Sequence, residues 1–340
     1  MSLITLLLGV GFLSSANSAE SADPREALKA RLLLLTNISA EFELHHSHNP
    51  SPEAMQFAER FNAQGRTSRM QVLSGEENIT GKFVFLDGSS RYESRRGKLG
   101  TRINVYLDER VEGLIQGANS DVTRGLISNT KPLPEEEIIG YALGLRLHLN
   151  EHWLGSRSFE GVSTATAPDG LLRLEIRDAS NENVTHIWTI DPSKSYALVR
   201  YQVLFRPKRP IEPGRDQPGA SRLMLDIRNL SFTSVDGIDL PKTIHCSVFH
   251  HAADGTRRER RTSTLNVTKY IINDPMNTKE SLLIVWPVGA IILDERTKTP
   301  IRVDSKARTL DNDVLNKAAE DWSNQQRGER VKKTGQEKRE

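Results

Sequence analysis

Residues 172–177 read Leu-Arg-Leu-Glu-Ile-Arg, and this run decides the fold because its apolar side chains recur at every second position. The same period continues through residues 197–205 and returns at residues 223–227 and 244–248. Successive side chains of a β-strand point to opposite faces, so this pattern is typical of strands with one buried and one solvated face. Turn residues separate the runs, which predicts a large one-sided antiparallel sheet.

The composition excludes several classes of protein. The chain has 340 residues, with 46 Lys and Arg against 44 Asp and Glu, and its formal net charge is +2. So small a net charge produces no overall field that would favour nucleic acid as a partner. Cys246 is the one cysteine, so no disulfide can form within the chain. One large domain with short extensions is the economical interpretation of this length.

The first residues have the pattern of an export signal. Residues 3–13 form an apolar core of signal-peptide length, and small residues follow from Ser14 to Ala19. The apolar run is too short to span a bilayer. We expect residues 1–19 to be a signal peptide, and the mature protein to lie in a bacterial periplasm or cell envelope without a transmembrane segment. The lack of disulfides favours that compartment over a eukaryotic secretory route.

Two helices are predicted beside the strands. The first begins at Pro24 and buries a stripe that contains Leu28, Leu32 and Leu35. The second spans residues 134–149, where apolar residues surround the helix on nearly all sides. A helix that is apolar all round is buried. We therefore expect this second helix to cover the apolar face of the sheet.

The upstream part of the chain predicts further strands. They are expected at residues 38–44, 68–74, 79–86, 89–95 and 102–108, with a turn or loop at 45–52.

The downstream part predicts loops and a tail. Residues 206–219 contain four prolines and should form an exposed loop. Residues 282–293 predict two short buried segments around a turn, because Pro and Gly interrupt the apolar run. We expect a main domain over residues 20–303, followed by a charged, largely disordered tail at 304–340 with one short helix near 311–322.

One motif has the spacing of a catalytic metal site. His148, Glu151 and His152 match the His-x-x-Glu-His order of inverted zinc peptidases, in which two histidines bind zinc and the glutamate activates water. Residues four apart are neighbours on a helix, so the spacing is physically sound. Such enzymes take a third ligand from a later helix, whereas the sequence downstream reads mainly as strands. We rank zinc chemistry below capped helix-end histidines, and expect no catalytic residue, metal or other cofactor.

Two further polar clusters have weaker claims to function. Alternation would place His46 and His48 on one face of a strand, where they could bind a metal if a neighbour supplied a third ligand. A polar strand end is the preferred interpretation of this cluster, which includes His45. The run at residues 257–261 contains four arginines, but alternation divides them between two faces, which favours a solvated strand over a phosphate site.

Several short stretches, together with the export signal and the first amphipathic helix, resemble LolA-like outer-membrane lipoprotein-sorting proteins, especially the exported LolA-like proteins of planctomycete-type bacteria. The stretches are Ile38–Phe42, Gly81–Phe85, Ile190–Pro192, Leu198–Arg200 and Pro287–Arg296. The resemblance implies a mainly β, α+β fold in which a curved antiparallel sheet forms an incomplete β-barrel covered by helices. It also implies that the concave apolar face receives lipoprotein acyl chains or related amphiphiles.

This resemblance makes the alternating strands and the apolar helix the candidate binding surface for a lipid or lipoprotein acyl chain. The candidate residues of the apolar face and its lid are Leu172, Leu174, Ile176, Val199, Tyr201, Val203, Leu223, Leu225, Ile227, Ile138, Ala142 and Leu145. Two alternatives stay open. One is an envelope-stress sensor or scaffold that binds a protein partner, such as an envelope membrane protein, and the other is the zinc-dependent hydrolase.

Overall fold

The computed structural model describes residues 23–50, 52–63, 74–97, 100–107, 110–117, 123–128, 138–145, 162–178, 181–206, 221–251, 256–304, 306 and 308–337. The predicted signal peptide lies outside the described residues. So do nearly all of the strand expected at 68–74 and of the loop expected at 206–219.

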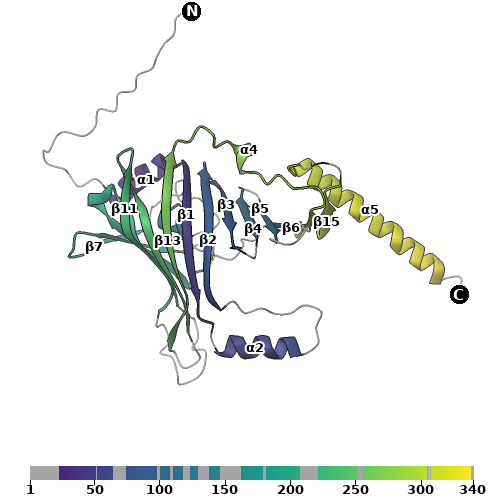
Figure 1. The fold of residues 1–340 in the computed structure, drawn as a ribbon, viewed down its shortest axis with the longest axis horizontal. Coiled ribbons are helices and arrows are strands. Elements are labelled where there is room, and N and C mark those ends of the chain that lie inside the picture. The colour runs from purple at the N-terminus through teal and green to yellow at the C-terminus, as the bar shows by residue number, and fades with distance from the viewer. Residues whose placement is uncertain are drawn as a thin grey trace, which may run out of the picture.

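Fifteen strands form one open, curved sheet (Figure 1), with the spatial order β15-β14-β6-β5-β4-β3-β2-β1-β13-β12-β11-β10-β9-β8-β7. Neighbouring strands are antiparallel except for β6 and β14, which are parallel. The predicted large antiparallel sheet is therefore confirmed. The strands are β1 (Asn37–His48), β2 (Gly75–Leu86), β3 (Ser89–Arg95), β4 (Thr101–Tyr106), β5 (Val111–Gln116), β6 (Thr123–Ser128), β7 (Ser163–Thr166), β8 (Leu172–Arg177), β9 (Val184–Asp191), β10 (Ala197–Phe205), β11 (Arg222–Val235), β12 (Ile238–His251), β13 (Arg257–Ile272), β14 (Ile291–Asp294) and β15 (Thr299–Arg302).

Apolar side chains are buried on both faces of this sheet, in two separate clusters. On β2, Phe83 and Phe85 belong to one cluster, whereas Val84 between them belongs to the other. We call the face that carries Phe83 the first face and its cluster the first core. The first core extends from β2 through β1 and β13 to β8, and also contains residues of the helices α1 (Pro24–Leu34) and α3 (Ile138–Ala142).

The opposite, second face carries a smaller second core over β2 to β6. The segment that crosses it runs from α4 (Lys279–Leu282) into the long helix α5 (Asn312–Glu337) and contributes the fully buried Trp286. Leu282, Ile284 and Ile292 are buried while Val285 and Ile291 are exposed, so the predicted pair of short buried segments is confirmed.

The chain remains part of the folded body beyond the expected boundary at 303. Leu310 and Leu315 are both buried in the second core. The short helix expected near 311–322 is the beginning of α5, which has 26 residues and extends away from the sheet in Figure 1.

The N-terminal helix confirms its prediction, and the next segment corrects one. Asp23 caps α1 by accepting a hydrogen bond from the backbone N–H of Arg25. The loop expected at 45–52 is wrong, because β1 continues through His48 and a helix, α2 (Pro52–Ala63), begins at Pro52. Proline has no backbone N–H, but the first turn of a helix does not need that donor, so Pro52 begins a helix where we expected a loop.

Candidate functional site

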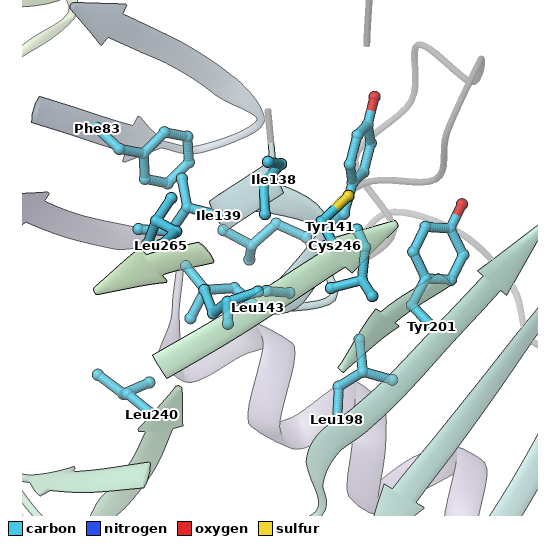
Figure 2. Packing of buried hydrophobic residues seen from close by; sticks show 14 of the residues in the cluster. Phe83, Ile138, Ile139, Tyr141, Leu143, Leu198, Tyr201, Leu240, Cys246 and Leu265 are labelled. Carbon is cyan, nitrogen blue, oxygen red and sulfur yellow. The ribbon is translucent and has the colours of Figure 1, made fainter. Parts of the chain in front are cut away.

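The helix α3 lies against the first face of the sheet. It contacts β10, β11 and β12, and every residue from Ile138 to Ala142 is buried. Figure 2 shows Ile139 and Leu143 between Phe83 and Leu265 on one side and Tyr201 on the other. Residues of the predicted helix at 134–149 that flank 138–145 lie outside the described residues.

A glycine turn ends α3 and brings one more apolar side chain to the first face. Gly144 has φ +77°, a left-handed conformation that residues with a Cβ rarely adopt. The backbone N–H groups of Gly144 and Leu145 donate to the carbonyls of Tyr141 and Gly140. Leu145 is fully buried after this turn, as are Ile138 and Ala142, so all three predicted lid residues lie in the first core.

Most of the predicted strand residues belong to this same core. Seven are buried in it, namely Leu172, Leu174, Ile176, Tyr201, Val203, Leu225 and Ile227. Val199 and Leu223 are only half-buried. The pairing register shifts beside each of them, so the simple alternation that we assumed breaks there, and Leu198 is buried in the core instead of Val199.

One asparagine side chain fastens α3 to the sheet. The Nδ2 group of Asn229 on β11 donates to the carbonyl of Ala142 at 2.9 Å and to the carbonyl of Leu198 at 2.6 Å. The side chain lies in the buried interior, where such hydrogen bonds compete with little water. Asn229 therefore acts as a polar latch between the helix and strands β10 and β11. We did not predict this role, because nothing in the sequence pairs residue 229 with residue 142.

A buried polar chain crosses β8 to β10 on the first face. The Nε2 atom of His186 lies 3.2 Å from Oδ2 of Asp178, and its Nδ1 atom lies 2.9 Å from the hydroxyl of Tyr201. The carboxylate fixes the proton on Nε2, so in the neutral imidazole Nδ1 accepts a hydrogen bond from Tyr201. The ring of Tyr141 on α3 lies 5.9 Å from that of Tyr201. We predicted Tyr201 as an apolar wall and missed its polar partners, although His186 stands in an alternating run.

The histidine cluster on β1 lies where the first face becomes polar. His46 and His48 share this face, with ring centroids 5.5 Å apart, as alternation predicted. The Nδ1 atom of His46 is hydrogen-bonded to the hydroxyl of Ser263 at 2.7 Å, while His45 bonds to Asn78. No set of three or more potential metal ligands occurs among the described residues.

Guanidinium groups surround these two imidazoles. Burial lowers the pKa of His46 to about 3, and the positive charges of Arg261, His48 and Arg96 lower it further in the same direction. Arg261 is the buried member of the arginine run on β13, whereas Arg260 is exposed. The prediction of a solvated strand therefore holds for Arg260 but not for Arg261. We refer to His46, His48, Glu77, Arg96 and Arg261 as the basic end of the first face.

The second face has an open hollow of about 440 Å³ above β1 to β3. Charged side chains of both signs line it, including Glu41, Glu43, Lys82 and Arg95. This mixture of charges differs from the first core, which is lined by apolar side chains. The hollow therefore does not resemble the predicted acyl-chain surface.

The zinc motif His148, Glu151 and His152 lies outside the described residues. In the part of the chain that is described, no helix is long and apolar enough to cross a membrane.

Comparison with known proteins gives matches only among solved structures. No family model matches the chain, and no curated protein matches it. The chain is similar to a crystal structure of a LolA superfamily protein from Nitrosomonas europaea, at 10% sequence identity and a TM-score of 0.40, covering 76% of this chain and 97% of that one. It is also similar to a DUF1329 family protein from Desulfovibrio piger, at 9% identity and a TM-score of 0.39, covering 77% of this chain and 100% of that one. The LolA-like resemblance noted in the sequence thus has a counterpart among solved structures.

Proposed function

We propose that this protein is an exported carrier that sequesters the acyl chain of a lipoprotein or of another amphiphile on the first face of its sheet, beneath α3. In this proposal residues 1–19 are removed on export, and the remaining chain acts in the periplasm or cell envelope. The curved sheet then serves as an incomplete barrel, and α3 serves as its movable cover.

The observation that carries the proposal is the position of α3. It is a short helix without a single polar side chain, and it packs on β10 to β12 with the Asn229 latch as its hydrogen bond to the sheet. Five helical residues have little stability of their own, since isolated helices of this length are marginal in water. Contacts with the sheet must therefore hold α3, and a competitor for those contacts can displace it.

The energies of such an exchange are comparable. Exposing Ile138, Ile139, Leu143 and Leu145 would cost roughly 6–12 kcal/mol, at about 1.5–3 kcal/mol for each side chain. Burying a chain of about fifteen methylene groups gains roughly 12 kcal/mol, at about 0.8 kcal/mol for each. An acyl chain can thus replace the helix without a large net change, which is the condition for reversible binding by a carrier.

Titration with a fluorescent long-chain fatty acid tests this proposal. Leu143→Ala removes a cover side chain and should strengthen binding, because less contact area holds α3 against the sheet. Leu230→Ala is the matched control, since Leu230 on β11 is 61% exposed. Its binding should equal that of the wild type.

Native mass spectrometry of the wild-type protein provides a second readout that needs no variant. Protein purified from an envelope should carry amphiphile adducts that organic extraction removes. Absence of adducts, together with no uptake of the fluorescent fatty acid, would exclude the carrier function. A pull-down that recovers a membrane regulator without lipid would favour the sensor or scaffold instead.

A further inference from the structure

The basic end adjoins the apolar part of the first face directly. On β1, His46 and His48 follow Leu44 on the same side of the strand, and Leu44 belongs to the first core. In the register of the sheet, His46 lies opposite Glu77 on β2, and His48 lies opposite Arg261 on β13. The first face therefore changes from apolar to basic within two residues along one strand.

The charged groups of the basic end are withdrawn from solvent. Arg261 is 5% exposed and His46 is 2% exposed. One carboxylate oxygen of Glu77 lies 3.9 Å from both the guanidinium of Arg96 and the ring of His48, which is the outer limit of an ion pair. Two guanidinium groups thus stand against one carboxylate that is loosely placed between them. An additional anion at this point would gain from both cations.

An amphiphile has the matching division of chemistry. Its alkyl chain needs an apolar surface, and an anionic headgroup needs cationic donors that are fixed in position. Guanidinium groups present several N–H donors in a plane and bind carboxylate or phosphate oxygens in pairs. Such charge-assisted bonds are strongest where water is excluded, as it is around Arg261.

We propose that the basic end, formed by Arg261, Arg96, His46 and His48, binds the anionic oxygen headgroup of the amphiphile whose alkyl chain occupies the first face. This inference rests on the proposed carrier function and adds the class of ligand to it. The headgroup chemistry is a carboxylate or a phosphate monoester joined to a long alkyl chain. Arg261 and Arg96 bind the oxygens, and the neutral imidazole of His46 orients the site from below through Ser263.

Binding of three probes with the same alkyl chain tests the inference: a fatty acid, its methyl ester and a lysophosphatidic acid. The wild type should bind at least one anionic probe about tenfold or more tightly than the neutral ester, as expected for a charge-assisted hydrogen bond. The stronger of the two anionic probes identifies carboxylate or phosphate as the natural headgroup.

Arg261→Gln should remove most of the difference between the anionic probes and the ester while leaving ester binding unchanged. Arg260→Gln is its matched control, because Arg260 is the exposed neighbour on the same strand, and it should bind all three probes as the wild type does. Arg96→Gln, at the end of β3, carries the test if the buried substitution prevents folding.

The failures of the two proposals can be told apart. Equal binding of acid, phosphate and ester by the wild type would overturn the headgroup site and leave chain binding intact. Equal effects of Arg261→Gln and Arg260→Gln would also overturn the site. No binding of any probe would overturn the carrier function on which the site rests.

Discussion

Replacing Gly125 with alanine should destabilise the second core strongly. A Cβ at this position would lie 2.2 Å from Cζ3 and 2.6 Å from Cη2 of Trp286, and 3.0 Å from Cγ1 of Ile292. The fully buried indole would have to move by about 1 Å to restore ordinary contact, and overpacking of this kind costs about 1–3 kcal/mol. Alanine also reduces the freedom of the unfolded chain, which offsets about 0.5–1 kcal/mol of that cost.

Urea unfolding of the purified protein measures this effect, and Gly113→Ala is the matched control. Gly113 lies on the neighbouring strand β5, and its added Cβ would meet Oδ1 of Asn104 at 3.4 Å, an ordinary contact. The transition of Gly125→Ala should shift to lower urea, while that of Gly113→Ala should stay near the wild type. A Trp286→Phe background should reduce the cost of Gly125→Ala, because the clashing ring atoms are absent. Equal stability of the two glycine variants would refute the described packing of Trp286.

Three further predictions follow from the buried polar groups. Tyr201→Phe leaves Nδ1 of His186 without its hydrogen-bond donor and should lower the free energy of unfolding by about 1–3 kcal/mol; an unchanged urea midpoint would contradict that bond. Burial raises the pKa of Glu112 in spite of its ion pair with Arg110, so the folded state holds this proton more tightly than the unfolded state. Stability should therefore fall as the pH rises through the raised value, and Glu112→Gln should flatten that fall, whereas equal slopes would exclude this cause. Burial raises the pKa of Cys246 to about 12, so a thiol reagent at neutral pH should label it only after unfolding or opening of the cover, and rapid labelling would show that the first core is open.

The sequence predicts the elements whose signals are local. The alternation at 172–177 and the leucine stripe of the first helix depend only on neighbouring residues, and both were confirmed. The apolar segment at 138–145 was expected to be buried for the same reason. These signals sufficed to predict the large sheet and most residues of its first core.

Features that depend on pairing between distant strands were not predictable from one sequence. Val199 stands in an alternating run, but a shift of register between β9 and β10 exchanges its burial with that of Leu198. The latch joins residues 229 and 142, and the buried polar chain joins Asp178 to Tyr201 through His186, so each becomes visible only when the register is known. The second core was missed because its strands β5 and β6 are short and its cover comes from the C-terminal segment.

Photo-crosslinking with a diazirine-bearing fatty acid tests the central claim most directly, because peptide mass spectrometry locates the bound chain. The carrier account predicts crosslinks to α3 and to the first-face residues of β10, β11 and β12, and their loss when unlabelled fatty acid competes. Crosslinks confined to the exposed apolar residues of the second face, such as Leu230, or no crosslinks that a competitor removes, would contradict it.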